Sequence, residues 1–550
     1  MNKKLINIKS AFLIIILSAG IFAFTDPGER YFAIAKNLDI FATLFKEVNA
    51  MYVDEVNPNQ LMQTGIEAML MSLDPYTNYI PEDDIEDFRT RSTGQYGGIG
   101  AITTRMDGKI MVSMIFNGYS AEKNGLKIGD QVIKINNIDI TEMDSESTSE
   151  LMKGQAGTPV SLTVLRYGKD EPITLNFTRE KVKIDNVPYS GMVADGIGYL
   201  KLTEFTMRAG EEVKNAVEAL KANGAEKIIL DLRNNPGGLL HEAVNICNVF
   251  IPKNKEVVST RGKIEEHNNV YKTEYRPVDT EIPLVVLINS GSASASEIVA
   301  GTIQDYDRGV IIGQKSFGKG LVQITRPLSY NAQLKVTTAK YYTPSGRCIQ
   351  ALDYSNRNED GSVGKVPDSL KNEFRTTNNR IVYDGGGIDP DVEISGEKLS
   401  PIAFTLIRDG HIFDYATKYF YEHPEITDAK DFALSTEEYA DFKKWLKERE
   451  YNYTTDVEKN LSSLSASAKK EQYYQDILPQ LEKLKETLQN SKQNDLEDFR
   501  DQIITLLEEE IASRYFFQKG SVEASFDEDQ VIKKSIEILN NPKEYQRILH

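Results

Sequence analysis

Three short segments of the 550-residue sequence contain residue types that could carry out nucleophilic catalysis. They are residues 231–238, 291–297 and 316–323, each next to a predicted strand. The middle segment, Gly-Ser-Ala-Ser-Ala-Ser-Glu, surrounds Ser294 with small residues, so a substrate backbone could approach its hydroxyl closely. A change from strand to helix at this point would offer the free amides of a helix N-terminus to a developing oxyanion. The pattern therefore predicts Ser294 as a nucleophile.

A serine nucleophile needs a base, and Lys319 is a better candidate than any histidine. The sequence has five histidines, and none, His241 included, is followed by a convincing orienting acid motif. Lys319 stands between two glycines and close to apolar residues. Burial would lower the pKa of its ammonium group from about 10.4 toward about 7.5, at a cost of about 4 kcal/mol. Gln323 could orient the amine without adding a charge.

Each of these segments also has an ordinary structural explanation when taken alone. Ser292, Ser294 and Ser296 are all suitable helix N-caps. A lysine between glycines is usually a surface loop residue, and residues 231–238 fit a strand that ends in a turn. The combination, in this order and spacing, favours a catalytic site.

A glycine-rich turn at residues 97–100 precedes a compact module of short predicted strands. Its residues could direct several backbone N–H groups into one concavity that fits a carboxylate, although such a turn is equally typical of a hairpin. The pattern L-x-x-G-D-x-V-x-x-I-N at 126–136 resembles a PDZ domain. A PDZ domain adds an extended peptide to its sheet edge and holds the terminal carboxylate with backbone amides. The resemblance implies these peptide-binding residues: Gly97, Gly98, Ile99 and Gly100.

Together, these motifs resemble the C-terminal processing peptidases, also called tail-specific proteases, which are PDZ-containing serine endopeptidases with a Ser/Lys dyad. The resemblance covers about residues 61–392, including Leu-Asp-Pro at 73–75 and Gly-Gly-Gly-Ile-Asp-Pro-Asp-Val at 385–392. Tyr76 replaces a frequent histidine of the family, outside the dyad.

The resemblance implies a role for each matching residue. Ser294 would be the nucleophile, Lys319 the general base and Gln323 the support of that lysine. The oxyanion donors would be the amide of Ala295 and one from Gly237 or Gly238. An acid at the position of Asp305 lies near the dyad and affects activity in some members. A basic residue near Lys153 couples peptide sensing to the active site in some relatives, but lysine lacks the planar fork of arginine.

The chain is predicted to be a multidomain α/β and β protein. Strands and helices alternate between residues 198 and 304, which indicates a layered core with largely parallel strands. We expect a helical domain at 31–91, a PDZ domain at 94–180, the α/β protease core at 187–398 and a helical extension at 399–550. The resemblance implies a crotonase-like, ClpP-like core with an inserted PDZ domain. Apolar residues at helical spacing in the extension could pack on the body or on a second subunit.

The first 24 residues are typical of an export signal. Lys3, Lys4 and Lys9 precede an uncharged apolar run of 14 residues at 11–24. Such a run matches a signal-peptide core and is shorter than the roughly 20 residues of a membrane span. No clean cleavage site is present, so both a cleaved signal and an uncleaved membrane anchor remain open. We expect an exported, periplasmic protein, either soluble or anchored to the inner membrane.

Composition limits the partners. The 64 basic and 82 acidic side chains leave a net charge of −18, which argues against nucleic-acid binding. Two cysteines and five scattered histidines form neither a disulfide framework nor a metal-ligand spacing, so we expect no metal and no cofactor. The expected partners are protein substrates with accessible, apolar C-termini, an activating adaptor or lipoprotein, and a second copy of the chain.

Two other functions are compatible with parts of the pattern. A non-catalytic PDZ adaptor would keep the α/β body as a scaffold, but the intact Ser294, Lys319 and Gln323 argue against it. An acyl-CoA-processing enzyme of the crotonase-like fold would leave the PDZ module unexplained, and no nucleotide-binding signature supports it.

Overall fold

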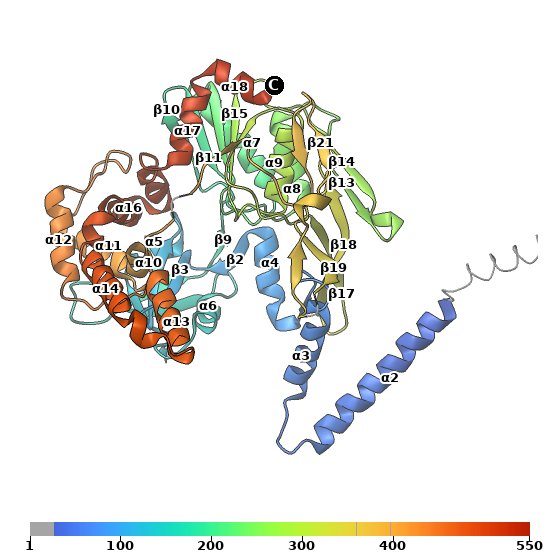
Figure 1. Cartoon of the computed structure of the whole chain (residues 1–550), viewed down its shortest axis with the longest axis horizontal. Helices are drawn as coiled ribbons and strands as arrows, with labels where there is room; N and C mark the ends of the chain where they lie inside the picture. The colour runs from blue at the N-terminus through green and yellow to red at the C-terminus, as the bar shows by residue number, and fades with distance from the viewer. Residues whose placement is uncertain (1–26, 359, 397) are drawn as a thin grey trace, which may run out of the picture. The chain divides into compact units, whose positions relative to one another are not determined.

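The computed structural model describes residues 27–358, 360–396 and 398–550, arranged in two compact units, Met1–Tyr79 and Ile80–His550 (Figure 1). The predicted export signal at 1–24 lies outside the described residues. Among the helices that are described, none is both long and apolar enough to cross a membrane.

The first unit contains helices α2 (Pro27–Met51) and α3 (Pro58–Met71). Asn57 caps α3 by accepting hydrogen bonds from the N–H groups of Asn59 and Gln60. Among the described side chains of both helices, Leu70 is the one buried hydrophobic residue. The region predicted as one helical domain at 31–91 is therefore divided, because α4 (Ile85–Thr93) belongs to the second unit.

A six-stranded sheet forms the centre of the second unit. Its order is β10-β11-β12-β15-β16-β23, and every neighbouring pair is parallel except β10 with β11. The middle strands are continuous apolar runs, as expected for strands that are covered on both faces. The strands are β10 (Tyr189–Ala194), β11 (Ile197–Lys201), β12 (Lys227–Asp231), β15 (Leu284–Ile288), β16 (Val310–Gly313) and β23 (Val392–Glu393).

Three helices that alternate with these strands cover one face of the sheet (Figure 1). They are α7 (Ala209–Ala222), α8 (Leu240–Phe250) and α9 (Ala295–Asp305). Their apolar sides pack on strand residues such as Leu230, Val286 and Ile311. The alternation of strands and helices that the sequence predicts is confirmed here to within a few residues.

The end of the chain covers the opposite face of the sheet. Phe526, which follows α16 (Arg500–Ala524), and Ile532 of α17 (Gln530–Leu539) lie in one cluster with Tyr199 and Val285, and α18 (Pro542–Leu549) adds further apolar residues to it. The Tyr545 hydroxyl also bonds to the backbone of Leu284. The helical extension predicted at 399–550 thus contributes one complete layer of the α/β core.

A second, antiparallel sheet lies beside this core, and the sequence patterns did not indicate it. It contains β13 (Glu256–Gly262), β14 (Asn269–Lys272), β17 (Leu321–Pro327) and β18 (Gln333–Tyr342), in the order β17-β18-β13-β14. Strands β17 and β18 follow the Lys319 segment directly in the chain. The sheet therefore sets the direction in which that segment leaves the core.

The PDZ region is a separate β module around its own core. Its sheet order is β3-β4-β5-β7-β8, so β3 is an edge strand with α6 next to it. The elements are β3 (Ala101–Met106), β4 (Lys109–Ile115), α5 (Ser120–Lys123), β5 (Gln131–Ile135), β6 (Ile138–Asp139), α6 (Ser145–Met152), β7 (Pro159–Leu165) and β8 (Ile173–Thr178), with β2 (Gln95–Gly98) paired to β9 (Glu180–Lys183).

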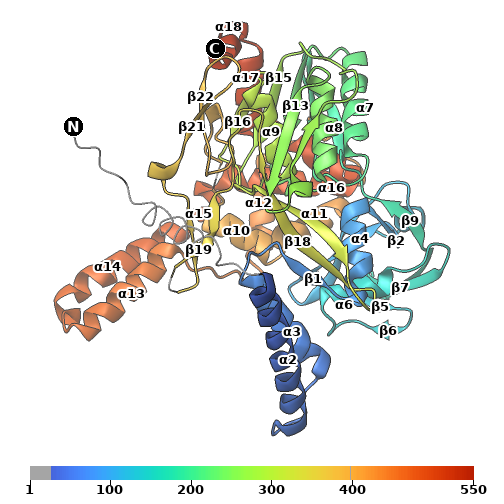
Figure 2. The same cartoon turned by 90° about the vertical axis from the view of Figure 1, so that its right-hand side faces the viewer.

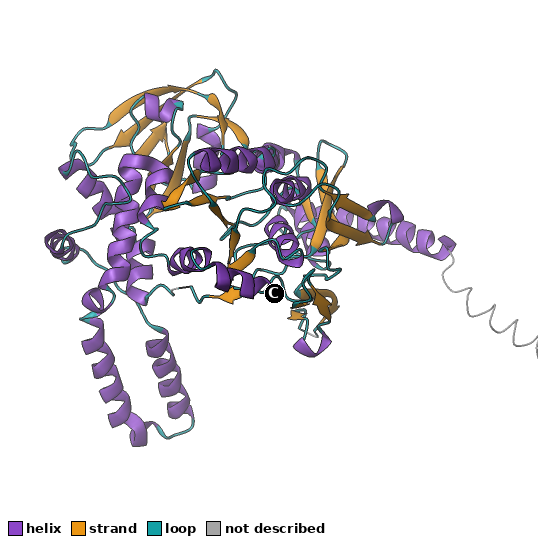
Figure 3. Cartoon of the chain, turned by 90° about the horizontal axis from the view of Figure 1, so that it is seen from above, coloured by secondary structure: helices purple, strands orange, loops and turns teal. Residues whose placement is uncertain are grey.

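Helices dominate the chain after β23, as predicted (Figure 1). Figure 3 distinguishes the helices of the chain, in purple, from its strands, in orange. The helices α10 (Pro401–Arg408), α11 (His411–Glu422), α12 (Thr436–Leu446), α15 (Asp495–Asp498) and α16 enclose an apolar core. Helices α13 (Asp456–Lys470) and α14 (Tyr474–Lys492) form a two-helix hairpin (Figure 2). Short elements complete the chain: β1 (Asn78–Ile80), β19 (Leu352–Arg357), β20 (Val363–Lys365), β21 (Glu373–Arg375), β22 (Ile381–Tyr383) and the 3-10 turns η1 (Glu82–Asp84), η2 (Glu265–His267) and η3 (Asp368–Leu370).

If the last helices form a layer of the core, Ile532→Ala should destabilise the chain. Ile532 is 1% exposed against the sheet, so the loss should be about 2–4 kcal/mol, because a cavity replaces packed atoms. The matched control is Leu484→Ala on the α13–α14 hairpin, where the residue is 49% exposed and the change should stay within about 0.5 kcal/mol. Calorimetric melting of both variants checks this, and equal melting temperatures would contradict it.

Candidate active site

The three predicted segments lie at the same edge of the central sheet. Residues 231–238 follow β12, residues 289–294 follow β15 and residues 314–320 follow β16, and these strands are parallel neighbours. The carboxyl ends of adjacent parallel strands therefore bring the three loops together. This edge is the usual ligand-binding side of an open α/β sheet.

Ser294 occupies the sharp turn between β15 and α9. Its backbone angles, φ 56° and ψ −110°, lie outside the regions that residues with a side chain normally adopt. Such strain persists only where the surroundings enforce it, and it clusters at functional sites. A serine on a strained strand-to-helix turn is also how α/β-hydrolases expose their nucleophile. The backbone thus singles out Ser294 from its neighbouring serines.

Two neighbouring serines hold this turn in place. The Ser292 hydroxyl donates to the carbonyl oxygen of Leu232 at 2.8 Å, and the Ser296 hydroxyl donates to that of Asn235 at 2.9 Å. The Ala293 amide also donates to Asn235, at 3.0 Å. Ser292 and Ser296, which the sequence allowed as helix caps, therefore join the serine turn to the 231–238 loop.

Glu297 joins the serine turn to the lysine loop. Its fully buried carboxylate accepts hydrogen bonds from the amides of Ser294 (2.8 Å) and Lys319 (2.9 Å) at Oε2. The Ser316 hydroxyl (2.5 Å) and the Gly318 amide (2.7 Å) donate to Oε1. We had not predicted this residue, although a glutamate three residues after a serine at a helix start is a recognisable capping pattern.

The protonation of Glu297 is sensitive to pH near neutrality. Burial raises its pKa to about 7, and the hydrogen bonds from Ser316, Lys319, Ser294 and Gly318 partly oppose that rise. A protonated carboxyl has one fewer accepting oxygen position for its four donors. The charge of this group therefore affects how firmly the two loops are held together.

Tyr341 provides a second link between the same two segments. Its buried ring lies on β18, and its hydroxyl is 3.0 Å from the carbonyl oxygen of Ser294 and 2.5 Å from that of Lys319. Ser294 and Lys319 are both partly exposed. The backbones of the predicted nucleophile and base are thus fixed next to each other by one carboxylate and one hydroxyl.

Gln323 lies on β17, at a point where the pairing with β18 shifts by one residue. Its Nε2 donates to the hydroxyl oxygen of Thr337 at 3.1 Å. The amide oxygen is then the end that remains to accept a hydrogen bond from an amine.

Gly237 touches the serine turn. A Cβ at this position would lie 2.6 Å from the carbonyl oxygen of Ala293 and 2.8 Å from the amide nitrogen of Ala295, and φ is 96°. Its own N–H donates to Oδ1 of Asn235 at 2.9 Å, so Gly237 is not an available oxyanion donor as the sequence allowed. The N–H groups of Gly238 and Ala295 have no acceptor within the described part of the chain.

Asp305 does not lie near the serine. It ends α9, ten residues after Ala295, which corresponds to about 15 Å along a helix. It forms an ion pair of 2.8 Å with Arg347, and both side chains are 1% exposed. The expectation of an acid near the dyad is therefore wrong for this residue, which joins α9 to the 343–347 turn.

A groove of about 230 Å³ lies between β3 and α6 of the PDZ region. Gly98 and Ile99 line it, and most of its other lining residues are apolar, including Ala101, Phe116 and Met152. Gly97 and Gly98 pair with β9 as strand residues, and only Gly100 among the three glycines has a positive φ, 82°. Within residues 97–100, a left-handed conformation is thus confined to Gly100.

Lys153 lies at the rim of this groove and forms an ion pair of 2.7 Å with Asp87 on α4.

The described residues contain no cluster of three or more His, Cys, Asp or Glu that could hold a metal ion. Burial raises the pKa of the Cys247 thiol to about 12, which makes it a poor nucleophile.

Comparison with known proteins identifies the family of the chain. Residues 196–355 match Peptidase family S41, residues 90–165 match the PDZ domain, and residues 402–539 match the family described as Probable PDZ-protease, C-terminal helical domain. A carboxy-terminal-processing protease of Bartonella bacilliformis is 38% identical over 321 residues, which cover 58% of this chain and 73% of the relative. The carboxy-terminal processing protease CtpA of Bacillus subtilis is 30% identical over 363 residues, covering 66% and 76%.

Among solved structures, the photosystem II D1 C-terminal processing protease aligns with 25% identity and a TM-score of 0.35, over 68% of this chain and 96% of that one. A peptide-bound PDZ domain of a Vibrio cholerae carboxy-terminal protease aligns with 26% identity and a TM-score of 0.16, over 16% and 99%. The chain belongs to the carboxy-terminal processing proteases of peptidase family S41. It is accordingly a serine-type endopeptidase with a PDZ domain and a C-terminal helical domain, as predicted.

Gly237→Ala should lower kcat about a hundredfold, because the new methyl group would displace the serine turn from the oxyanion donors. Gly224→Ala is the matched control, since its φ of 91° imposes similar backbone strain but its Cβ would meet no described atom within 4 Å. Cleavage kinetics on an unstructured protein substrate would check this. Equal kcat values in the two variants would contradict contact between Gly237 and the serine turn.

Glu297 should make stability depend on pH between its unfolded and folded pKa values, 4.5 and about 7. The folded state keeps a proton that the unfolded state releases, so stability is lost as pH rises through this range. The free energy of unfolding of the wild type, relative to Glu297→Gln, should fall by about 3 kcal/mol. Urea unfolding of both proteins between about pH 5 and about pH 8 measures it. Parallel pH profiles would show that Glu297 ionises normally.

Proposed function

We propose that this protease cleaves peptide bonds with Ser294 as the nucleophile and Lys319 as the general base. The observation that carries the proposal is the buried Glu297 carboxylate, which binds the amides of both residues, together with the strained backbone of Ser294. A helix start alone would account for the bond from the Ser294 amide, but not for the bond from the Lys319 amide or for the strained turn. The second bond fixes the backbone of Lys319 relative to that of Ser294.

The reaction is acyl transfer through a covalent intermediate. Oγ of Ser294 attacks the peptide carbonyl carbon while its proton passes to the neutral amine of Lys319. The C–N bond then breaks, and Lys319 delivers that proton to the leaving amine. Water attacks the acyl-enzyme, again giving a proton to Lys319, and the ester bond to Ser294 breaks with return of the proton to Oγ.

Backbone amides would stabilise the oxyanion, and Gln323 would orient the lysine. We assign the oxyanion donors to Ala295 and Gly238, because the Gly237 amide is already bonded to Asn235. The neutral amide of Gln323, held by Thr337, can accept a hydrogen bond from the Lys319 amine without adding a negative charge beside it.

The PDZ domain binds the C-termini of substrates. We propose that it selects apolar terminal side chains, since the groove beside β3 is lined mainly by apolar residues. The bound tail would pair with the open edge of β3 and be directed to the protease core. A PDZ domain in this role can also block the site until a peptide or partner arrives, and we propose such gating here.

Other features of the chain are proposed from the sequence pattern and the family. The basic residues before the apolar run at 11–24 support export to the periplasm, with or without retention as an inner-membrane anchor. An activating adaptor or lipoprotein and a homo-oligomer are proposed partners. The parallel sheet with helices on both faces supports a crotonase-like, ClpP-like core.

The direct test is degradation of an unstructured protein with an apolar C-terminus by the purified chain. Wild type should cleave it, and Ser294→Ala and Lys319→Ala should each lose at least about a thousandfold in kcat. Lys315→Ala is the matched control: Lys315 is in the same loop, paired with Asp389 at 2.7 Å, and should remain active. Replacing the substrate's terminal residues with acidic ones should raise KM.

Two results would contradict the proposal. Cleavage by Ser294→Ala would mean that another residue is the nucleophile. A wild-type chain that binds the tail without cleaving it, with or without added partners, would favour the PDZ adaptor function.

A further inference from the structure

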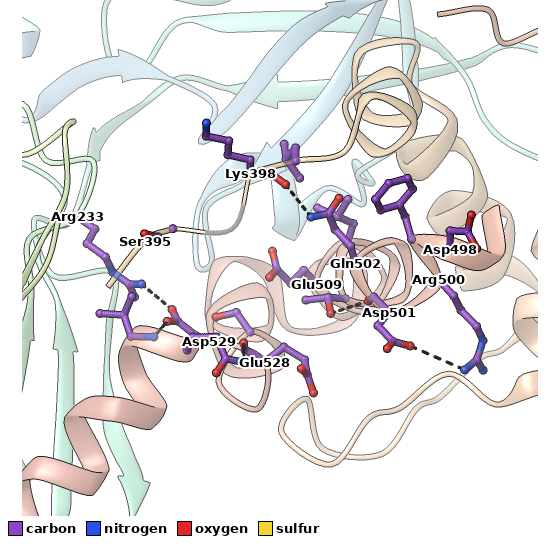
Figure 4. A pocket seen from close by; sticks show the side chains of 18 of the residues that line it. Arg233, Ser395, Lys398, Asp498, Arg500, Asp501, Gln502, Glu509, Glu528 and Asp529 are labelled. Atoms are coloured by element: carbon purple, nitrogen blue, oxygen red, sulfur yellow. Dashed lines mark hydrogen bonds and ion pairs between the residues drawn. The ribbon is translucent and has the colours of Figure 1, made fainter. Parts of the chain in front are cut away.

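The loop that touches Ser294 begins at an arginine bound to two carboxylates. Arg233 donates to Asp231, through Nε at 3.0 Å and Nη2 at 2.6 Å. Its Nη1 lies 2.7 Å from Oδ2 of Asp529, almost 300 residues later in the chain (Figure 4). This ion pair stands at the edge of a pocket of about 610 Å³ that is lined mainly by the helical domain and the loop after β23.

The group of charges is largely shielded from water. The side chains of Arg233 and Asp529 are 19% and 17% exposed, and that of Asp231 is 1% exposed. Burial alone would raise the pKa of Asp231, but the Arg233 guanidinium holds it below its usual range. At such burial an ion pair is stronger than at the surface, and the loss of one partner leaves a charge that is poorly solvated.

The position of Arg233 determines where the loop goes next. Its backbone amide donates to Asp231 at 2.9 Å, and Asn234 then turns the chain with a φ of 59°. The buried Asn235 bonds to the carbonyl oxygen of Leu202 and accepts from the amide of Gly237. Gly237 rests against the serine turn. Hydrogen bonds within the loop, and then one close backbone contact at Gly237, thus connect the Arg233 backbone with the serine turn.

Asp529 is itself fixed to the sheet. It is the N-cap of α17 and accepts hydrogen bonds from the amides of Val531 and Ile532. Ile532 packs on the central sheet. The Asp529 carboxylate therefore has a defined place relative to the strands that carry the catalytic loops.

We infer that Asp529 is a positioning residue for proteolysis. Through Arg233 it holds the 233–238 loop so that Gly238 and the serine turn keep their relation, and the C-terminal helical segment becomes part of the catalytic apparatus. The inference rests on the proposed roles of Ser294 and Gly238. Asp529 touches neither substrate nor nucleophile, so it acts on the reaction step and not on tail binding.

Asp529→Asn separates the two roles of this side chain. Asparagine caps a helix as well as aspartate does, so α17 should persist while the negative charge is lost. We expect kcat to fall about tenfold, with KM for an unstructured protein substrate unchanged. Asn541→Ala is the matched control, because it removes the N-cap of α18 on the same sheet face without touching Arg233. It should lower the melting temperature and leave kcat unaltered.

Hydrogen exchange of the purified full-length chain tests the positioning without turnover. Amides at 233–239 should exchange faster in Asp529→Asn than in the wild type, while those of α17 stay protected. A wild type without activity would refute the proposed function, and the exchange result would still decide this inference. Unchanged exchange at 233–239, or an unchanged kcat in an active enzyme, would overturn it. A fall in kcat of the same size in Asn541→Ala would also overturn it, since helix stability alone would then explain the effect.

Discussion

The buried carboxylate of Glu297 imposes the main constraint on this site, because one side chain must satisfy donors from two loops that follow different strands. Its oxygens accept from Ser294 and Lys319 on one side and from Ser316 and Gly318 on the other. Burying a carboxylate raises the free energy of the folded state unless its hydrogen bonds are complete. Any movement of either loop that breaks one of these bonds is therefore unfavourable. The strained turn of Ser294 is tolerated because this network, with the bonds of Ser292 and Ser296, leaves it no other position.

That network depends in turn on a sheet covered on both faces. Helices α7 to α9 pack on one face, and the last helices of the chain pack on the other. Segments that are far apart in the sequence therefore meet at the site. Two of its loops follow β12 and β15, and Asp529 at the start of α17 forms an ion pair with Arg233 in the first of these loops. The segment after residue 399, which carries no recognisable catalytic motif, supplies helices that pack against the central strands.

The sequence predicted three segments as the place of the chemistry and was less informative about what holds these segments together. Small residues around Ser294, the glycines beside Lys319 and the alternation of strands and helices are local patterns, and the structure brings the predicted residues to one sheet edge. The role of Glu297 depends on amides from a loop about 20 residues later, and that of Asp529 on a contact across almost 300 residues. Asp305 was misjudged because its role came from the family resemblance alone, although a helix that starts after Ser294 already places residue 305 at its far end. The sequence left open whether the C-terminal helices pack on the body or on a second subunit, because an amphipathic pattern shows that a helix covers a surface without showing which one.

The measurement that tests the central claim most directly is a crystal structure of Glu297→Ala next to that of the wild type. If this carboxylate holds the serine turn and the lysine loop together, the variant will keep its central sheet while residues 316–320 move away from Ser294 and the Ser294 backbone relaxes toward ordinary angles. If both segments superpose on the wild type, with the same strained turn, then Tyr341 and the flanking serines are sufficient to hold the site, and Glu297 is not the group on which it depends.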